Sequence, residues 1–509
     1  MKQGLTKNLS VSVPIAIGLG GLVCLVNPGE KPLVGWLGSA VLSFVFLFGI
    51  VYAIQKLQSP KKVRLISLIN FSVRVIAGIA LFLMLPIFGY EEEPPQAGYL
   101  YLDAYRRDAN AWQIASDAEP IFTGFQDEFY TDQYGGMLSL SAVVYRAFSP
   151  DAHRPILILL LTSFISTLGI PFYWQALQER FGNLTATIAC WILALYPEAV
   201  ILGGSQMREP LIIGLSGIIL WGLEHRKINK RAGMIALLSA FLALMVISSR
   251  YAIAVSLLIA IWVWSDLTSQ DTAKQKKIWQ ILPLVVIILA GLLVSWEWLV
   301  DTSRWDLYLM ESSSGRVQFE LDNIGEQFRI PFLVLYGILQ PVLPAAIAYP
   351  GIAIMRVIAI FRSAGWYALA PTLLLAPFIM PKETNKRNRK ILILTTCFLF
   401  FWTLLSSLRA GGDQWDNPRY RTALLPWFAL VAGWVFIYFK EHKNPWLKRA
   451  YSILTVFCLF FLQWYFSRYY KLWERLPFVQ MVLVLSVTIV VMLGGFLIHD
   501  RLRGGAGKK

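Results

Sequence analysis

Charged side chains are scarce in this chain of 509 residues, where Asp, Glu, Lys and Arg together make up 15%. In a typical soluble protein these four residue types make up about a quarter of the chain. Hydrophobic residues make up 56%, and the mean hydropathy is +0.56. This balance excludes an ordinary soluble globular domain.

Cysteine and histidine are also sparse, with four of each. The cysteines all fall inside apolar runs, as expected of small buried residues rather than disulfides or zinc ligands. The histidines are scattered singly, with no partner at ligand spacing: His153, His225, His442 and His499. The sequence therefore predicts no metal site and no cofactor; a divalent metal stays open but has no support.

Long apolar runs are abundant instead. A helix needs about 17–25 apolar residues to cross the hydrocarbon core of a bilayer. The runs predict an all-α polytopic membrane protein with about 14 transmembrane helices, at 11–28, 33–55, 65–89, 155–177, 184–203, 209–224, 233–248, 251–267, 279–299, 366–381, 391–408, 421–439, 451–467 and 477–498.

The net charge of +15 follows from the orientation of these helices. With a cytoplasmic N-terminus, the segments richest in Lys and Arg all fall on the cytoplasmic side, as the positive-inside rule requires. Both termini are then cytoplasmic and the membrane is a bacterial-type plasma (inner) membrane. The charge needs no nucleic-acid partner. The first apolar run is interpreted as a retained span, since no small-residue cleavage site follows it.

Two apolar segments do not fit a single clean crossing. Residues 330–363 contain four prolines and two arginines, which favours a re-entrant, interfacial or paired in-and-out element on the outer side. Residues 135–148 are too few to cross and are expected to form an interfacial helix.

The longest outer loop, residues 90–154, contains the stretch "YRRDANAWQIASDAEP". A helix is expected from about Asp103 to Ala118, with Trp112 on its membrane side. Asp108 lies one turn before Trp112 and can point toward a cavity. A carboxylate in this position can serve as a general base.

Two further outer segments place ionisable residues at membrane edges, where charge is costly unless it is paired or functional. They are "GGSQMREPL" and "GGDQWDNPRYRTALLPW". An arginine fork suits the oxygens of a lipid-linked phosphate, and aromatic rings suit a sugar face. The candidates for charge are Arg208, Glu209, Arg419 and Arg421 of these segments, together with Arg250 of "SSRYA" in an outer loop between two spans. The candidates for stacking are Trp112 and Tyr134 of the longest outer loop, and Tyr420. Helix-end ion pairing and snorkelling to headgroups remain open for these arginines.

The order of these motifs resembles the GT-C superfamily of integral membrane glycosyltransferases, in particular the branch related to protein O-mannosyltransferases and the lipid A aminoarabinose transferase. "DANAWQIA" from Asp108 is similar to the family's first acidic motif, although Ala109 stands where a second acid is common. "DQYGGMLSLSAVVYRAF" resembles its interfacial helix, and "SQMREPLIIG" its second acidic site. "NPRYRTALLPWFALVAGW" is similar to its basic entry to a late span.

The resemblance covers residues 65–440, which would form the catalytic core with the outer loop 90–154. Residues 1–64 would add two N-terminal spans, and 441–509 would form C-terminal spans and a basic tail. It implies that Asp108 is the catalytic base and Glu209 a second acid. The lone acid of the first motif puts a metal requirement in doubt.

The implied reaction moves a sugar from a polyprenyl-phosphate donor to an acceptor (a protein, a lipid or a glycan) at the outer face. Arg208, Arg419, Arg421 and Arg250 would bind the phosphate, and Trp112, Tyr134 and Tyr420 the sugar or the acceptor. Membrane lipids are the other expected partners. The alternatives are a transporter or flippase of a lipid-linked or anionic substrate, and an O-antigen-type ligase or polymerase. Arg74, inside a predicted span, is the kind of residue a transporter would have.

Overall fold

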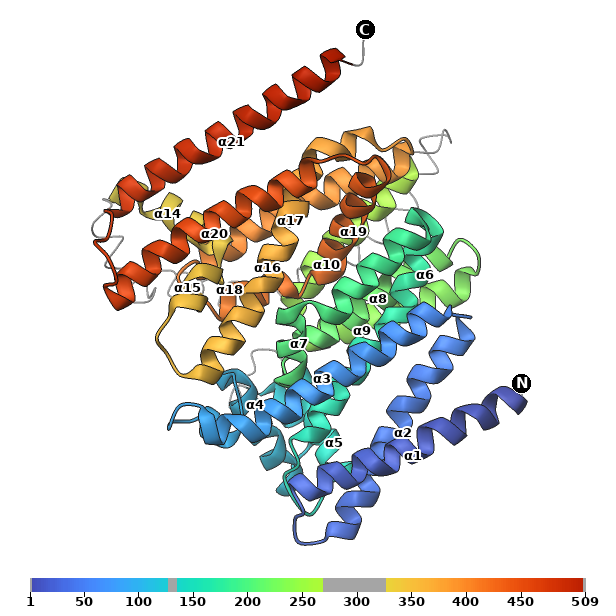
Figure 1. The fold of residues 1–509 in the computed structure, drawn as a ribbon. Helices are drawn as coiled ribbons and strands as arrows, with labels where there is room; N and C mark the ends of the chain where they lie inside the picture. The colour runs from blue at the N-terminus through green and yellow to red at the C-terminus, as the bar shows by residue number, and fades with distance from the viewer. Residues whose placement is uncertain (1, 127–134, 269–325, 507–509) are drawn as a thin grey trace.

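The computed structural model describes residues 2–126, 135–268 and 326–506, and Figure 1 shows their fold. Every regular element in these ranges is helical, as the apolar runs predicted. The elements are α1 (Lys2–Val26), α2 (Pro32–Lys56), α3 (Lys61–Phe88), η1 (Pro95–Ala97), α4 (Leu102–Ser116), η2 (Ile121–Phe125), α5 (Gly136–Phe148), α6 (Ile156–Leu195), α7 (Pro197–Gly204), α8 (Glu209–His225), α9 (Lys230–Ile247), α10 (Ser249–Thr268), α14 (Glu326–Leu339), α15 (Leu343–Ala348), α16 (Ala353–Ile379), η4 (Met380–Lys382), α17 (Lys386–Ala410), α18 (Asp416–Thr422), α19 (Leu425–Glu441), α20 (Trp446–Tyr470) and α21 (Phe478–Ala506).

Nine of the described helices are long and apolar enough to cross a bilayer, and the bent pair α18–α19 makes ten if it is one span. Their outward side chains are apolar: Leu68, Ile76 and Leu83 of α3 are exposed, whereas Asn70 and Arg74 of the same helix are buried. A soluble protein rarely leaves so much apolar surface in water. The chain is therefore a polytopic helical membrane protein.

The expected number of 14 spans is not confirmed. The expected span 209–224 corresponds to α8, which has 17 residues. This length makes about 25 Å of helix, which is less than the thickness of the hydrocarbon core, about 30 Å. In α1 the apolar part, Ser12–Val26, is shorter than the helices that can cross a bilayer. The expected span 279–299 lies outside the described residues. The expected span 155–177 and the first part of 184–203 lie in α6, on either side of a bend at Gly182 (φ 83°), and the rest of 184–203 lies in α7.

The second of these two crossings is interrupted between α6 and α7, and a buried arginine stabilises the break. Pro197 has no N–H, so the carbonyl of Leu193, four residues earlier, lacks its helical hydrogen-bond donor. The guanidinium of Arg74 takes this place, donating to the carbonyls of Leu193 and Ala194 at 2.9 and 3.1 Å. Because backbone groups inside a membrane must be satisfied by the protein, Arg74 has a structural role.

The proline-containing segment 330–363 forms the end of α14, then α15, and then the beginning of α16. The expectation that the next span begins near residue 366 is wrong, because α16 begins at Ala353. No proline interrupts residues 353–365, and one of the two arginines of this stretch, Arg362, has a buried carboxylate partner. The helix therefore continues through a segment whose two arginines, Arg356 and Arg362, had suggested an interfacial position.

At one end of the bundle, buried ion pairs join four helices. Arg180 of α6 lies 2.5 Å from Glu224 of α8 and also contacts Asp266 of α10. Arg387 of α17 contacts Asp266 as well. The basic segments that follow α8 and precede α17 thus lie at the same end of the bundle, as the alternation of spans requires.

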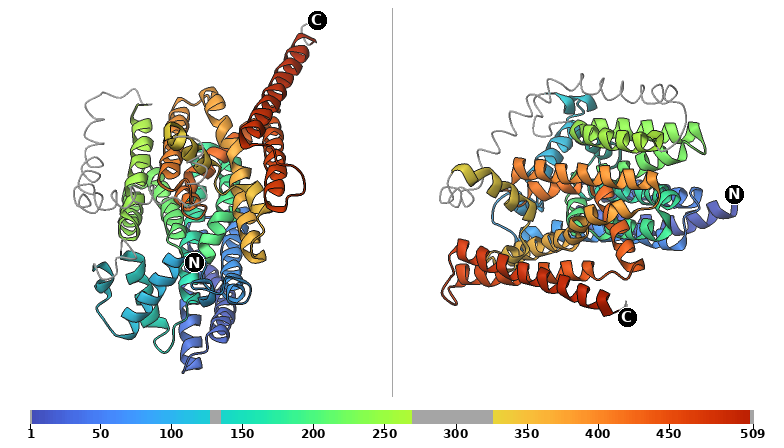
Figure 2. Two further views of the ribbon diagram at one scale, coloured as in Figure 1. Left: turned by 90° about the vertical axis from the view of Figure 1, so that its left-hand side faces the viewer. Right: turned by 90° about the horizontal axis from the view of Figure 1, so that it is seen from above.

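The opposite end of the bundle carries α4 and α5, beside the turn between α1 and α2 (Figure 1). Both helices lie where the sequence predicted helical segments, at 103–118 and 135–148. The C-terminal helix α21 extends away from the bundle, as Figure 2 also shows. We call the end that carries α4 and α5 the α4 end; all the candidate site residues that the structure describes lie there or beside it.

Candidate functional site

Asp108 of α4 lies in a cluster that we call the Asp108 cluster: Asp108, Tyr99, Tyr145, His153 and Trp112. The Tyr99 hydroxyl donates to Oδ2 of Asp108 and the Tyr145 hydroxyl donates to Oδ1, each at 2.5 Å. Nε2 of His153 lies 2.8 Å from Oδ2. Asp108 itself is only 3% exposed. Both of its carboxylate oxygens are therefore hydrogen-bonded inside the protein.

The two tyrosines of the cluster remain hydrogen-bond donors. Burial raises the pKa of Tyr99 and Tyr145 well above that of an ordinary phenol, and the charge of Asp108 raises it further. The Trp112 ring stacks on the His153 ring with 5.5 Å between centres and meets the Tyr145 ring edge-on at 5.8 Å. Trp112 therefore packs inside the cluster rather than resting only on a membrane surface.

A second group, the Arg419 cluster, consists of Arg419, Asp103, Glu209 and Asp416. A guanidinium nitrogen of Arg419 lies 3.0 Å from a carboxylate oxygen of Asp103, 3.0 Å from one of Glu209 and 3.1 Å from one of Asp416. One buried cation thus joins α4, α8 and α18. These partners explain how Arg419 can be buried at the edge of a membrane.

Glu209 is the most buried acid of the Arg419 cluster, with 1% exposure. No donor in the described part of the chain is aligned for a hydrogen bond with either of its carboxylate oxygens, so its contact with Arg419 is a close charge pair only. Buried polar groups in native proteins are normally hydrogen-bonded. Glu209 is therefore suited to receive a hydrogen-bond donor from a ligand.

The ionisation of Asp103 depends on this cluster. Burial alone would raise the pKa of Asp103, but the charge of Arg419, with those of Arg208 and Arg107, outweighs burial and holds the pKa below its usual value of 3.8. The ionised form is thus the one that the fold favours.

We expect Asp103→Asn to change how stability depends on pH. Because the folded pKa lies below the unfolded one, Asp103 stabilises the fold above about pH 4 and loses this contribution as the pH falls through the folded pKa. The variant should unfold at a lower temperature than the wild type at about pH 5, and the difference should narrow toward about pH 3. Thermal unfolding of detergent-purified protein measures this; a gap that widens on acidification would contradict it.

Three further candidates lie beside the Arg419 cluster. Arg208 immediately precedes α8, and its charge acts on Asp103. The hydroxyl of Tyr420 donates to Asp416 at 3.2 Å, and Arg250 lies close enough for its charge to act on this phenol. The structure therefore gathers Glu209, Arg208, Arg250, Arg419 and Tyr420 in one region.

Arg421 points elsewhere. Its guanidinium donates to the carbonyl of Ile338 at 3.0 Å and to that of Gln340, and it lies 4.0 Å from the centre of the Trp366 ring. These carbonyls lie at and just beyond the end of α14, where helical N–H donors are lacking, and that of Ile338 also accepts from the Trp366 indole N–H at 2.8 Å. Arg421 thus fixes the end of α14, which the sequence could not reveal.

The two clusters share α4 but occupy different faces of it. Asp103 and Asp108 are five residues apart, which corresponds to about 7.5 Å along the axis and about 140° around it. Between them, Arg107 donates to the backbone carbonyl of Gln206 at 2.6 Å. The site residues from the first acidic motif (Asp108, Trp112) therefore form one group, and those of the later motifs, apart from Arg421, form the other.

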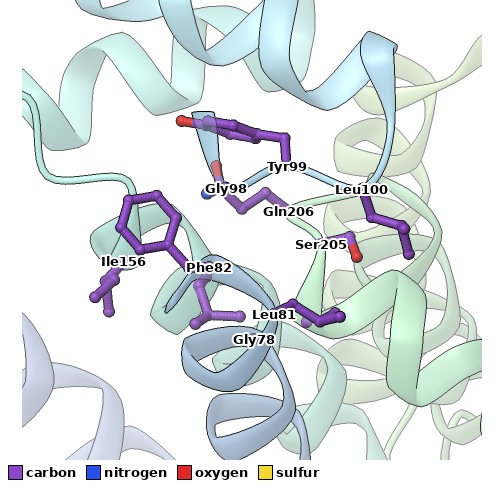
Figure 3. A pocket seen from close by; sticks show the side chains of 11 residues that line it. Gly78, Leu81, Phe82, Gly98, Tyr99, Leu100, Ile156, Ser205 and Gln206 are labelled. Atoms are coloured by element: carbon purple, nitrogen blue, oxygen red, sulfur yellow. The ribbon is translucent and has the colours of Figure 1, made fainter. Parts of the chain in front are cut away.

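A small cleft adjoins the Asp108 cluster between α3, α6 and the turn after α7 (Figure 3). Tyr99 and Gln206 lie along one edge of it, and Phe82 and Ile156 along the other. Ser205 Oγ and Gln206 Oε1 are buried without a hydrogen-bond partner among the described residues. The cleft is thus mainly apolar, with polar groups beside Tyr99.

Sequence reasoning missed several residues of the site. His153 is a lone histidine in the sequence, Tyr99 belongs to no recognisable motif, and Tyr145 lies in the expected interfacial helix but was not a candidate. It also missed the pair of Glu198 of α7 and Arg362 of α16, whose side chains form two hydrogen bonds of 2.6 and 2.7 Å and are almost fully buried. These partners are distant in sequence, so no local spacing could have indicated them. The candidate Tyr134 lies outside the described residues.

Fold and site together define a polytopic helical membrane protein with an acid–imidazole pair and an arginine-centred ion-pair cluster at one end. In the described ranges no group of three His, Cys, Asp or Glu residues is arranged to hold a metal ion. No protein-family model matches the chain, and no curated protein matches it in sequence.

Proposed function

We propose that this protein is a membrane glycosyltransferase that moves a sugar from a polyprenyl-phosphate donor to an acceptor, and that the α4 end is its outer, catalytic side. The observation that carries the proposal is the environment of Asp108. This buried carboxylate is paired with the partly exposed imidazole of His153, and its helix, α4, also carries Asp103 of the Arg419 cluster. The resemblance of the motifs to the GT-C superfamily supports the same reaction.

The chemistry requires two functions close together. A base must accept the proton of the attacking acceptor hydroxyl, and cations must stabilise the charge that develops on the leaving phosphate. The Asp108 cluster supplies groups for the first function. Arg419, Arg208 and Arg250 are candidates for the second, with Glu209 and Tyr420 beside them to contact the sugar or the acceptor.

A transporter or flippase of a lipid-linked substrate is the second candidate. Interrupted spans with charges near the midplane favour it, and the break before Pro197 beside Arg74 is such a feature. However, Arg74 donates to carbonyls next to that break, which explains it without a substrate. An O-antigen-type ligase or polymerase would depend on the loop 300–329, which lies almost entirely outside the described residues.

Reconstitution separates the enzyme from the transporter. The purified protein in proteoliposomes receives undecaprenyl-phosphate-linked hexoses and pentoses, labelled in the sugar, with a membrane extract from cells lacking the chain as the acceptor source. We expect labelled acceptor together with free undecaprenyl phosphate. Movement of intact donor across the bilayer without release of undecaprenyl phosphate would refute the proposal.

A further inference from the structure

The Asp108 carboxylate is poorly placed to accept a proton from a substrate. Its Oδ1 accepts from Tyr145, and its Oδ2 accepts from Tyr99 and His153. Both tyrosines are buried, and so is Asp108. An acceptor hydroxyl could reach either oxygen only by displacing one of these donors.

His153 is placed differently. Its side chain is 31% exposed. Its Nε2 faces Asp108, while Nδ1 has no hydrogen-bond partner among the described residues. A carboxylate that accepts from Nε2–H fixes the neutral tautomer in which Nδ1 carries the free electron pair. The imidazole thus presents a basic nitrogen on the side away from Asp108.

We propose that His153 is the catalytic base of the sugar transfer and that Asp108 is the positioning residue that orients it. This inference rests on the proposed function and changes the role that the motif resemblance gives to Asp108. The same division of labour, in which a buried carboxylate holds an imidazole that exchanges the proton, operates in the Ser-His-Asp triad.

The turn that carries His153 is fixed on both sides. The fully buried guanidinium of Arg154 donates to the carbonyls of Asn27 and Pro28 at 2.9 and 2.7 Å, and to Asp151 at 2.7 and 2.9 Å. The Ser149 hydroxyl donates to the carbonyl of Ala152 at 2.6 Å. A catalytic group must be held within a fraction of an ångström of its working position, and the α1–α2 turn contributes to that here.

The aromatic residues of the cluster favour an imidazole that gains a proton. Trp112 stacks on the His153 ring at an interplanar angle of 20°, and the Tyr145 ring meets it edge-on with 5.2 Å between centres. An aromatic face stabilises a cation above it. The titratable or charged groups around His153 are Asp108 from α4, Tyr145 from α5, Tyr99 after η1, and Asp151 with Arg154 on its own turn.

The reaction balances as follows. The acceptor oxygen forms a bond to the anomeric carbon of the sugar while the bond from that carbon to the phosphate oxygen breaks, and its electron pair stays on the phosphate. The acceptor proton passes to Nδ1 of His153, and Asp108 stabilises the imidazolium. The proton then leaves to solvent through the exposed side of the ring. The products are the glycosylated acceptor and polyprenyl phosphate.

The test compares His153→Gln with the wild type in the reconstituted system above. Gln can still donate to Asp108 but cannot accept a proton, so kcat/KM should fall by about 10²–10⁴-fold while binding of the labelled sugar donor is retained. His153→Ala should regain part of its activity on addition of free imidazole. His225, which stacks on Trp221 at 4.2 Å at the opposite end of the bundle, gives the control, since His225→Gln should transfer as the wild type does.

The pH profile provides a readout that a structural role would not change. A base must be unprotonated to act. The wild-type kcat/KM should therefore fall on the acid side of its pH profile, and that limb should be absent from the residual activity of His153→Gln. Near-normal transfer by His153→Gln, or an acid limb that it retains, would show Asp108 itself to be the base. No release of undecaprenyl phosphate by the wild type from any sugar donor would overturn the proposed function as well.

Discussion

Replacing Asp108 with Asn should abolish sugar transfer while leaving the protein folded and able to bind the sugar donor. The amide has nearly the shape of the carboxylate, but it carries no charge and presents an N–H₂ group to a site that holds three hydrogen-bond donors. The tautomer of His153 is then no longer fixed, and the imidazolium that forms during transfer loses its counter-charge. Such a change in an acid–imidazole pair costs on the order of 10⁴-fold in rate.

Release of undecaprenyl phosphate and labelling of the acceptor measure this effect, and Asp117→Asn provides the control. Asp117 follows the same helix but is exposed, and within the described ranges its side chain accepts only from Ser116. The variant Asp117→Asn should therefore transfer the sugar at the wild-type rate. Transfer by Asp108→Asn at half the wild-type rate or more would exclude the Asp108 cluster from the chemistry.

The largest expected effect on stability comes from breaking the pair of Glu198 and Arg362. Arg362→Met would leave Glu198 charged and buried with no counter-ion, and would also remove the guanidinium that lies 4.3 Å from the centre of the Trp415 ring. Removing one partner of a buried pair costs about 3–5 kcal/mol. The variant should unfold at a markedly lower temperature in detergent, and its yield from membranes should fall.

A double variant separates the lost pair from lost packing. Glu198→Gln combined with Arg362→Met removes both charges, and such replacements are often close to neutral for stability. The double variant should therefore recover most of the unfolding temperature that the single variant Arg362→Met loses. Arg449→Met is the control, because its partner Asp500 is 40% exposed and stays in contact with solvent when the guanidinium is removed. Equal unfolding temperatures for the single variant Arg362→Met and the wild type would contradict this account of the pair.

The helical fold could be predicted from sequence because a bilayer imposes one length and one composition on every crossing. The ends of the apolar runs at 33–55, 233–248 and 391–408 lie one to five residues from the observed helix ends. The gap predicted between 155–177 and 184–203 contains the observed bend at Gly182. The start of α16 at Ala353 was missed, because the prolines before this residue and the arginines after it had suggested an interfacial segment.

The candidate site could be predicted only in part. Asp108, Glu209 and Arg419 stood out because ionisable residues at membrane edges are costly, and each lies in one of the two clusters. Their partners could not be found in the same way. His153 is 45 residues from Asp108, so only the packing of the α5–α6 turn against α4 reveals the pair. For Arg421, the sequence suggested a phosphate, whereas its contacts are with carbonyls just before and at the break after α14.

Conversion of a pre-bound sugar donor tests the account most directly. The wild type and Asp108→Asn are loaded with labelled undecaprenyl-phosphate sugar, freed of excess, and mixed with the acceptor extract. We predict that both retain the donor until mixing, and that only the wild type then yields labelled acceptor and undecaprenyl phosphate in equal amounts. Equal conversion by both proteins, or release of intact donor by the wild type, would contradict the account.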